Sequence, residues 1–447
     1  MSSVSQYAQT LGDILEEEAC VLARETGFIQ RERRINGADF VQTLIFAWLQ
    51  EPQSNLDGLV QVLGHREVQM SAPGLSQRFT PQAARLLHEV LSRLSQQQMQ
   101  AEAGVECALL RRFEAVILED SSQISLPPEL VEVWQGNGGT QGTSGAAVKL
   151  FVRWDVCGGQ LWGPSLTDGR CSDQRGPFSL EELPVGSLYV ADLGFFSLAR
   201  LAKLCQGPRT QRRYVVTRYQ PKTLLRTRSG HRIDLRGIAP QAVGEAKELG
   251  VLVGRDQRLP MRLVMLRVPA EVAEKRREKM KQDAKDRGKT VTEETLALAD
   301  WLIVLTNVPR RLLSLAEVFV ILRLRWQIER LFRLWKEHGH IDEWRSKNPW
   351  RVLTELYAKL CAMLIQQWLI QEGCWADPYR SLVKAAQVVR RESMRLLSAL
   401  VEGGLTLVLT SVISLIGGPG CRMNRRRKAK STAQLLMEGL DWPIVLT

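Results

Sequence analysis

Apolar residues recur at steps of three and four along the N-terminal quarter of the chain. Three segments carry this spacing, with polar breaks between them: VQTLIFAWL (41–49), LDGLVQVL (56–63) and PQAARLLHEVLSRL (81–94). Such spacing lines one face of a helix with apolar side chains, so it predicts an all-helical region over residues 1–105. Within it, Ser71 to Phe79 followed by Thr80-Pro81 is typical of a turn leading into a capped helix. A helix-turn-helix and a plain helical bundle both fit this pattern.

Beyond residue 105 the pattern changes to short apolar runs of strand length. The run AVIL (115–118) stops abruptly at Glu119-Asp120, and the run SLYVA (187–191) ends on Asp192. Strand alternation puts Glu119 and Asp120 on opposite faces. Two buried strands that each end on an aspartate are therefore predicted.

The segments around these two strands complete an α/β pattern. Alternation over residues 147–156 predicts a half-buried strand, and residues 160–162 are expected to pair back antiparallel through the Gly158-Gly159 turn. The helix-like FFSLARLAKLC (195–205) leads to a strand over residues 213–217. Residues 219–300 have a different pattern, with short strand-like runs such as RLVMLRV. These runs precede the charged segment RREKMKQDAKDRGKTVTEE, which is most simply a solvated helix and loop. We interpret this stretch as a β-rich insertion.

The core resumes with the apolar strand WLIVL (301–305), which is followed by the most regular helical pattern in the chain. Ser314-Leu-Ala-Glu317 is a capping-box pattern, and the helix is predicted to continue to about His338. Its apolar stripe consists of Ile321, Leu324, Ile328, Leu331 and Trp335. The neighbouring row consists of Leu322, Arg325, Glu329, Phe332 or Arg333, and Lys336. Such a helix buries one edge on a sheet and directs one acid and several bases into a cleft. A second long amphipathic helix is predicted over Leu353–Ile370.

Composition and charge indicate the compartment and the class of partner. The chain has 60 Lys and Arg against 48 Asp and Glu, a net charge of +12, so a polyanion such as nucleic acid is a plausible partner. The eight cysteines form no CxxC pairs and are interpreted as reduced thiols. The N-terminus lacks a secretory pattern, and the apolar segment Leu405–Ile416 is shorter than the roughly 20 residues of a spanning helix. We therefore expect a cytoplasmic protein without a membrane segment, in which Leu405–Ile416 packs on another helix.

Two strand-end aspartates and one helical glutamate suit the chemistry of phosphodiesters. Cleavage and strand joining put negative charge on a pentavalent phosphorus, which two divalent cations stabilise through hard oxygen ligands. Asp120, Asp192 and Glu329 provide such ligands if the strands before the two aspartates are neighbours. Singly, each has a simpler interpretation: a strand-end Asp is often a turn or cap residue, and a Glu four residues from an Arg on a helix often forms a solvated surface pair.

The segment Arg325-Trp-Gln-Ile-Glu329, with Lys336 after it, resembles the Tyr, Arg, Glu, Lys signature of IS4-like DDE transposases of bacterial insertion sequences. The spacing of the last three letters matches, and the resemblance extends over roughly residues 105 to 350. It implies an RNase H-like catalytic fold in which Asp120, Asp192 and Glu329 are catalytic and bind two Mg²⁺ ions, with Mn²⁺ able to substitute. It also implies that Arg325 and Lys336 hold transposon-end DNA.

Further DNA contacts follow from the same resemblance, with one departure. Arg218 and Arg333 resemble DNA-contacting basic positions, and Trp301 resembles an aromatic that stacks a flipped base, although a strand Trp is more often part of the core. Leu322 stands where the signature has Tyr. The loss of that hydroxyl affects the efficiency or the route of hairpin processing and leaves the metal site intact.

The predicted protein has an RNase H-like mixed sheet flanked by helices and three parts along the chain. Residues 1–105 are a helical DNA-binding domain, residues 106–345 the catalytic core with an insertion at about 219–300, and residues 346–447 a helical region for assembly. The resemblance implies cut-and-paste transposition through a hairpin, by a homodimer on double-stranded terminal inverted repeats and target DNA, at the bacterial nucleoid. A metal-dependent nuclease or resolvase, a ribonuclease on the same fold and a catalytically silent DNA-binding relic remain alternatives.

Overall fold

The computed structural model describes residues 3–31, 35–97, 104, 107–138, 145–205, 208, 211–286, 288–374, 377, 379–423, 432 and 435–436. The chain divides into two compact units. Unit 1 comprises Met1–Val105, Ser121–Cys171 and Ile328–Arg425, and unit 2 comprises Glu106–Asp120, Ser172–Gln327 and Arg426–Thr447.

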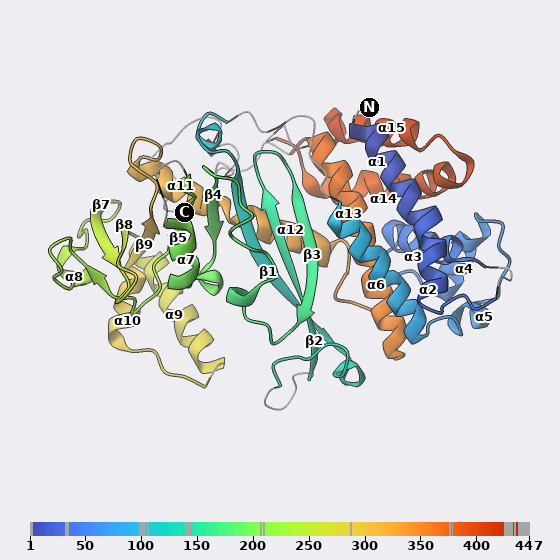
Figure 1. Ribbon diagram of the computed structural model, residues 1–447, viewed down its shortest axis with the longest axis horizontal. Helices are drawn as coiled ribbons and strands as arrows, with labels where there is room; N and C mark the ends of the chain where they lie inside the picture. Colours follow the sequence, from blue (N-terminus) through green and yellow to red (C-terminus); the bar gives the residue numbers. More distant parts are fainter. Residues whose placement is uncertain are drawn as a thin grey trace. The chain divides into compact units, whose positions relative to one another are not determined.

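Unit 1 is mainly a helical bundle whose members come from both ends of the chain. Its helices are α1 (Ser3–Gly12), α2 (Ala19–Glu25), α3 (Gly37–Gln50), α4 (Leu56–Gly64), α5 (Ala72–Ser76), α6 (Pro81–Gln96), α13 (Pro349–Cys374), α14 (Leu382–Glu402) and α15 (Leu405–Gly417). Helix α13 packs against α3, α6 and α15, and α14 packs against α3 (Figure 1). The predicted N-terminal helices are confirmed, and their packing is that of a bundle. The assignment of residues 1–105 to DNA binding and residues 346–447 to assembly stays a prediction.

Side-chain caps set the starts of the N-terminal helices. Asn36 and Asp39 form a capping box at the start of α3, in which the Asn36 side chain accepts from the Asp39 N–H. The Thr80 side chain accepts from the Ala83 N–H, and Pro81 occupies the first position of α6. The predicted capped helix after Ser71 is thus confirmed, with the short α5 in front of it.

Helix α13 is buried around its whole circumference, so the prediction of an amphipathic helix over Leu353–Ile370 was wrong. Two of its polar side chains, those of Glu355 and Lys359, form a buried pair inside the bundle. Lys359, only 1% exposed, lies 2.8 Å from the Glu355 carboxylate and also donates to the carbonyl oxygens of His340 and Glu343. These polar residues resemble a solvated face in sequence, but neighbouring segments cover them in the fold. None of the described helices is long and apolar enough to cross a membrane, and α15 packs against α1, α13 and α14 as predicted for Leu405–Ile416.

Unit 2 contains a mixed sheet in the strand order β1-β4-β5-β9-β8-β7-β6. Its strands are β1 (Val116–Leu126), β4 (Leu188–Ala191), β5 (Tyr214–Arg218), β6 (Leu225–Arg226), β7 (Ala246–Val253), β8 (Leu259–Arg267) and β9 (Trp301–Thr306). The pairs β1–β4 and β4–β5 are parallel, whereas β5–β9, β9–β8, β8–β7 and β7–β6 are antiparallel (Figure 1). Its helices are α7 (Leu198–Cys205), α8 (Leu235–Ile238), α9 (Ala270–Asp286), α10 (Glu293–Ala297) and α11 (Leu315–Leu324).

The predicted fold class is confirmed. The chain runs through β1, the antiparallel hairpin of β2 (Ala146–Asp155) and β3 (Leu161–Asp168), then β4, α7 and β5, which is the order expected of an RNase H-like core. The insertion after β5 supplies β6, β7, β8 and the largely exposed α9 before β9 returns beside β5. Both the β-rich character of residues 219–300 and the solvated charged helix are therefore as predicted. Strand β1 and helix α12 (Trp326–Glu337) each continue from unit 2 into unit 1.

Three local predictions need correction. Strand β1 does not stop at Leu118 but continues through Asp120 to Leu126, since Ile124 and Leu126 are buried while polar residues alternate with them. Strand β2 is buried on both faces, including Arg153, instead of half-buried. The helix predicted from Ser314 to about His338 is divided at Arg325 into α11 and α12, although its capping box forms as predicted.

Candidate active site

Asp120 and Asp192 lie beside each other because of the pairing of β1 with β4. The two strands are parallel, and their register places Glu119 opposite Ala191. Asp120 follows Glu119 in β1, and Asp192 follows Ala191, the last residue of β4. The condition that the strands before the two aspartates are neighbours is therefore met. Asp120 itself lies within β1 and not at its end.

Both carboxylates face the same guanidinium, that of Arg325. Arg325 Nη1 is 3.9 Å from Asp120 Oδ2, and Arg325 Nε is 3.8 Å from Asp192 Oδ1. The Arg325 side chain is 11% exposed and that of Asp120 17%, whereas that of Asp192 is 41% exposed. One cation thus offsets the repulsion between two neighbouring anions in a partly desolvated place. Arg325 stands at the break between α11 and α12, which the sequence pattern did not reveal.

Glu119 is oriented away from this group and belongs to a different interaction. Its carboxylate is fully buried and lies 3.1 Å from Nη2 of Arg200 on α7. The same Arg200 nitrogen donates to the Tyr189 hydroxyl at 3.0 Å. Burial acts to lower the pKa of Arg200, but Tyr189 and Glu119 outweigh it and raise that pKa. Glu119 therefore serves as the internal partner of Arg200, and Asp120 is the acid beside Asp192.

The remaining predicted residues of the signature lie on or before α12. Glu329 is in the first turn of α12, four residues after Arg325. Arg333 is exposed, with its Nε 3.6 Å from the Glu337 carboxylate. Lys336 donates to the Gln123 carbonyl of β1 at 3.1 Å. Lys336 thus ties α12 to the strand that carries Asp120.

Burial decides the one position of this row for which two residues were considered. Phe332 is buried and Arg333 is exposed, so only Arg333 continues the polar row. Leu322, which stands where the signature has Tyr, is 6% exposed on α11. All five residues of the predicted apolar stripe are buried, as expected: Ile321, Leu324, Ile328, Leu331 and Trp335.

Arg218 and Trp301 lie on the neighbouring strands β5 and β9. Arg218 is the last residue of β5 and pairs in register with Val304 of β9. Trp301 begins β9, and its Nε1 donates to the Pro240 carbonyl at 2.8 Å. The guanidinium of Arg267 lies over the Trp301 ring, 4.9 Å from its centroid. The indole is thus held by Pro240 and Arg267, two residues of the insertion.

The chemistry of the donors fits a divalent cation. In the part of the chain that the structure describes, no three His, Cys, Asp or Glu side chains form a group that could hold a metal ion. Asp120 and Asp192 nevertheless supply neighbouring carboxylates, the ligands that Mg²⁺ prefers. The positively charged Arg325 guanidinium already lies within 4 Å of both carboxylates.

The free thiols predicted for the eight cysteines are confirmed, and burial raises the pKa of Cys205 to about 12.

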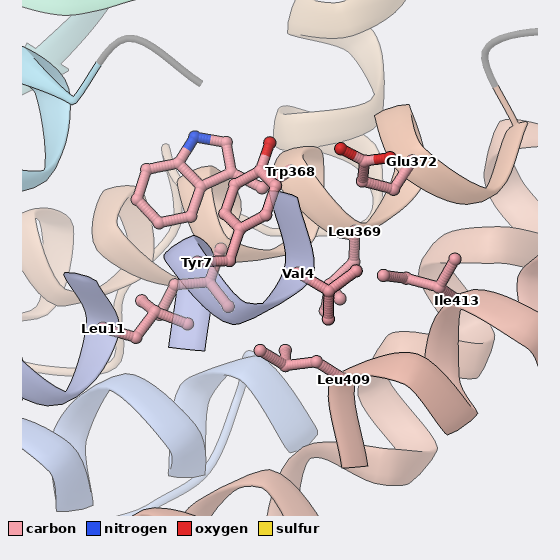
Figure 2. A pocket seen from close by; sticks show the side chains of 9 residues that line it. Val4, Tyr7, Leu11, Trp368, Leu369, Glu372, Leu409 and Ile413 are labelled. Atoms are coloured by element: carbon pink, nitrogen blue, oxygen red, sulfur yellow. The ribbon is translucent and has the colours of Figure 1, made fainter. Parts of the chain in front are cut away.

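A small apolar pocket lies within unit 1 among α1, α13 and α15. Figure 2 shows Tyr7 and Trp368 on one side of it and Leu409 and Ile413 on another. The ring centroids of Tyr7 and Trp368 are 5.5 Å apart. Burial and the nearby Glu372 carboxylate raise the pKa of Tyr7. The pocket is lined by packing residues of the bundle and brings together no catalytic group.

Two arginines with marked roles were missed in the sequence. Arg200 lies in the helix-like run FFSLARLAKLC, where its partner Glu119 is distant in sequence. Arg276 lies in the charged run RREKMKQ, which has the composition of a solvated helix, yet it donates to the Trp301 carbonyl. A single arginine among apolar residues was the only available signal for Arg200, and nothing distinguished Arg276 from its charged neighbours.

Comparisons with known proteins assign the chain to a family. Residues 111–365 match the family described as Transposase DDE domain. The chain is 27% identical over 380 residues to the transposase for insertion sequence element IS231C of Bacillus thuringiensis subsp. berliner, with 80% of this chain and 77% of that protein covered. It is 23% identical to the transposase for insertion sequence element IS1151 of Clostridium perfringens, with 78% and 77% covered. A piggyBac transposase synaptic complex with hairpin DNA has a TM-score of 0.43 and 10% identity, with 95% and 87% covered. The chain therefore belongs to the DDE-domain transposases and is an insertion-sequence transposase, an enzyme that binds and acts on DNA.

Proposed function

We propose that Asp120, Asp192 and Glu329 are the catalytic carboxylates of this transposase. The observation that carries the proposal is the parallel register of β1 and β4, which sets Asp120 beside Asp192 with Arg325 within 4 Å of both. Isolated strand-end aspartates usually serve turns, but two on adjacent strands that share one partly buried cation form a charged group with no turn function.

Glu329 joins this set through its position on α12. Residues four apart on a helix share a face, so Glu329 follows Arg325 on the row that the sequence predicts to face the acids. The Arg325 side chain is 11% exposed and faces two aspartates, which supports a role for this row beyond a solvated surface pair. Glu329 is then the one acid of that row in the first turn of α12.

The proposed reaction cleaves DNA at the terminal inverted repeats and joins the freed end to target DNA. Water first attacks the phosphodiester at the end of the element, and the released 3′-hydroxyl then attacks the opposite strand to form a hairpin. Reopening of the hairpin and attack on target DNA complete the transfer. A DDE domain implies divalent metal use, and such ions would stabilise the charge that develops on the attacking and leaving oxygens.

Each residue of the site has a separate task in this proposal. Asp120, Asp192 and Glu329 would hold two Mg²⁺ ions, or Mn²⁺ in their place, by their carboxylate oxygens. Arg325 positions the two aspartates and, as DNA enters, turns its guanidinium to a backbone phosphate. Lys336 holds α12 on β1 through the Gln123 carbonyl. Two element ends must be held together during transfer, so we propose a homodimer in the DNA complex.

The test uses a labelled duplex that carries the element's own terminal repeat, with Mg²⁺ or Mn²⁺ and unlabelled target DNA. The wild type is compared with Asp192→Asn and Glu329→Gln. The matched control is Glu337→Gln, because it is the same substitution on the same helix at an exposed residue paired with Arg333. We expect cleavage, hairpin and joined products with the wild type and the control, and none with the two site variants.

The outcomes separate the alternatives. Repeat binding that survives in Asp192→Asn and Glu329→Gln while all products vanish supports the proposed site. Cutting without joining by the wild type would favour a nuclease or resolvase. A wild type that binds the repeat but gives no metal-dependent product would point to a DNA-binding relic, and products that persist in Glu329→Gln would exclude Glu329 from catalysis.

A further inference from the structure

The two strands that lead to the proposed catalytic aspartates carry charged or polar groups on both faces of the sheet. Side chains alternate along each strand, so the parallel register of β1 and β4 places Glu119 and Tyr189 on one face. Asp120 and Asp192 are on the opposite face, where Arg325 lies within 4 Å of both carboxylates. The face that carries Glu119 and Tyr189 has an arginine of its own.

Arg200 of α7 links β1 to β4 behind the two aspartates. Its Nη2 lies 3.1 Å from the Glu119 carboxylate on β1 and 3.0 Å from the Tyr189 hydroxyl on β4. Glu119 is fully buried, and the Arg200 side chain is 13% exposed. One nitrogen therefore donates to both strands in a place from which water is largely excluded, where a charge-assisted hydrogen bond is strong.

The same arginine also contacts the segment that begins at Asp192. Asp192 precedes a single 3₁₀ turn, and its carbonyl accepts from the Phe195 N–H at 3.0 Å. The Arg200 guanidinium lies 5.8 Å from the centroid of the Phe195 ring. Its Nη1 donates to the Gln174 carbonyl at 3.4 Å, and the Gln174 side chain donates to the Phe196 carbonyl at 2.9 Å. Arg200 thus contacts both strands and the turn that follows the second aspartate.

Stability alone gives no reason for a charged pair at this place. Desolvation of both charges offsets most of their attraction, so apolar side chains of similar size often stabilise a fold as well as a buried ion pair does. A buried network of hydrogen bonds does fix geometry, because its donors and acceptors are satisfied at one arrangement of the elements that carry them. The arrangement fixed here is that of the two strands that hold Asp120 beside Asp192.

We propose that Arg200 is a positioning residue for the proposed metal site. Through its partners on the two strands it holds Asp120 and Asp192 at the spacing that binds a divalent cation. The inference rests on the proposed catalytic carboxylates and extends their site to the opposite face of the sheet. Arg325 lies on the metal side and must be displaced when a cation binds, whereas Arg200 acts from behind and stays in place. A metal site depends in this way on residues that orient its ligands without touching the metal.

The simpler account is that the pair of Arg200 and Glu119 only stabilises the fold, so a variant that keeps its stability should keep its affinity for metal. The test measures Mn²⁺ binding to the full chain without DNA, from the electron paramagnetic resonance signal of free Mn²⁺, together with the urea midpoint in EDTA. The main variant combines Glu119→Leu with Arg200→Met, which leaves no unpaired buried charge. The control combines Glu181→Leu with Lys203→Met, the same substitutions at an exposed ion pair of 2.9 Å made by the same helix.

We expect the main variant to have a urea midpoint near that of the wild type and a Kd for Mn²⁺ that is about tenfold higher. The control should bind Mn²⁺ with the wild-type Kd. A wild-type Kd in the folded main variant would overturn the proposal. If that variant does not fold, Tyr189→Phe decides in its place, because it removes only the hydroxyl to which Arg200 donates. A raised Kd in Tyr189→Phe supports the proposal, and an unchanged Kd overturns it.

Asp192→Asn in the same titration separates this inference from the proposal on which it rests. If Asp192→Asn removes Mn²⁺ binding while the variants of the Arg200 network keep the wild-type Kd, the carboxylate site stands and only the positioning role fails. If Asp192→Asn binds Mn²⁺ as the wild type does, or if the wild type binds none, the carboxylate site itself is wrong and the positioning role falls with it.

Discussion

The substitution Arg325→Gln tests whether Asp120 and Asp192 form a cation site. The guanidinium lies 3.9 Å from Asp120 and 3.8 Å from Asp192, and at an effective dielectric constant of 20 each such pair has a gross attraction of about 4 kcal/mol. Desolvation and screening reduce this value. The Asp192 side chain is 41% exposed, so its pair contributes less than about 1 kcal/mol, while the less exposed Asp120 pair contributes about 1 to 3 kcal/mol. Loss of both should lower the metal-free free energy of unfolding by about 1 to 4 kcal/mol.

The same substitution should increase the stabilisation by a divalent cation. Without the guanidinium, two neighbouring carboxylates are left with less compensating charge, and a cation that binds the folded state at 100 times its Kd adds about 2.7 kcal/mol. In the wild type the cation must first displace Arg325 from the aspartates, so the gain is smaller. The readout is the urea midpoint in EDTA and at increasing Mg²⁺ or Mn²⁺ concentrations, with no DNA present.

The controls are chosen to isolate the two aspartates. Arg333→Gln is the same substitution at an exposed residue with an i,i+4 pair to Glu337, so it should change stability by less than about 0.5 kcal/mol and leave the metal response at the wild-type level. Arg325→Gln combined with Asp192→Asn should lose the extra metal stabilisation. An equal metal response in the wild type and Arg325→Gln would refute the reasoning that Arg325 and the metal compete for the same carboxylates.

Three further predictions concern stability, each read from urea midpoints. Lys359→Met should lower the free energy of unfolding by about 3 to 5 kcal/mol, because Glu355 is left buried without its cation. The double variant with Glu355→Leu should recover much of this loss, and an equal loss in the single and double variants would contradict the reasoning. Burial raises the pKa of Glu248, but hydrogen bonds and charge from Arg262 lower it more, so its folded-state pKa lies below the unfolded one. Glu248→Gln should therefore destabilise by about 1 to 3 kcal/mol above roughly pH 4.3, with the difference vanishing as the pH falls through the folded pKa; a difference that is constant with pH would exclude this origin. Gly339→Ala should lower the free energy of unfolding by about 1 to 3 kcal/mol, because the added Cβ would lie 2.6 Å from the Trp335 carbonyl oxygen. An unchanged midpoint would show that the backbone relaxes without cost.

The strands that carry the aspartates were predictable because they are short, apolar and bounded by acids. The register of β1 on β4 was not, since pairing between residues more than sixty apart leaves no periodic trace in one sequence. The prediction also ended β1 too early. Ser121, Ser122 and Gln123 look like a turn, but Ile124 and Leu126 continue the buried side of the strand.

The helical row around Glu329 was predicted from periodicity, and the break at Arg325 was missed because the apolar spacing continues across it from Leu324 to Ile328. Arg325 itself has helical backbone angles of φ −49° and ψ −32°. Its role as shared partner of two aspartates depends on tertiary contacts alone. The same limit applies to α13, where Lys359 and Glu355 suggested a solvated face and instead form a buried pair. The local sequence pattern was thus enough to locate the acids, whereas their ion-pair partners could be identified only from the folded structure.

The insertion leaves the sheet at Arg218 and returns on the adjacent antiparallel strand, with Thr217 opposite Leu305. A two-residue hairpin turn is enough to connect neighbouring antiparallel strands, so the geometry of the core does not depend on the length of what lies between them. The loops of residues 219–300 can therefore change in length while β8 stays paired with β9 and the strands that carry Asp120 and Asp192 keep their register.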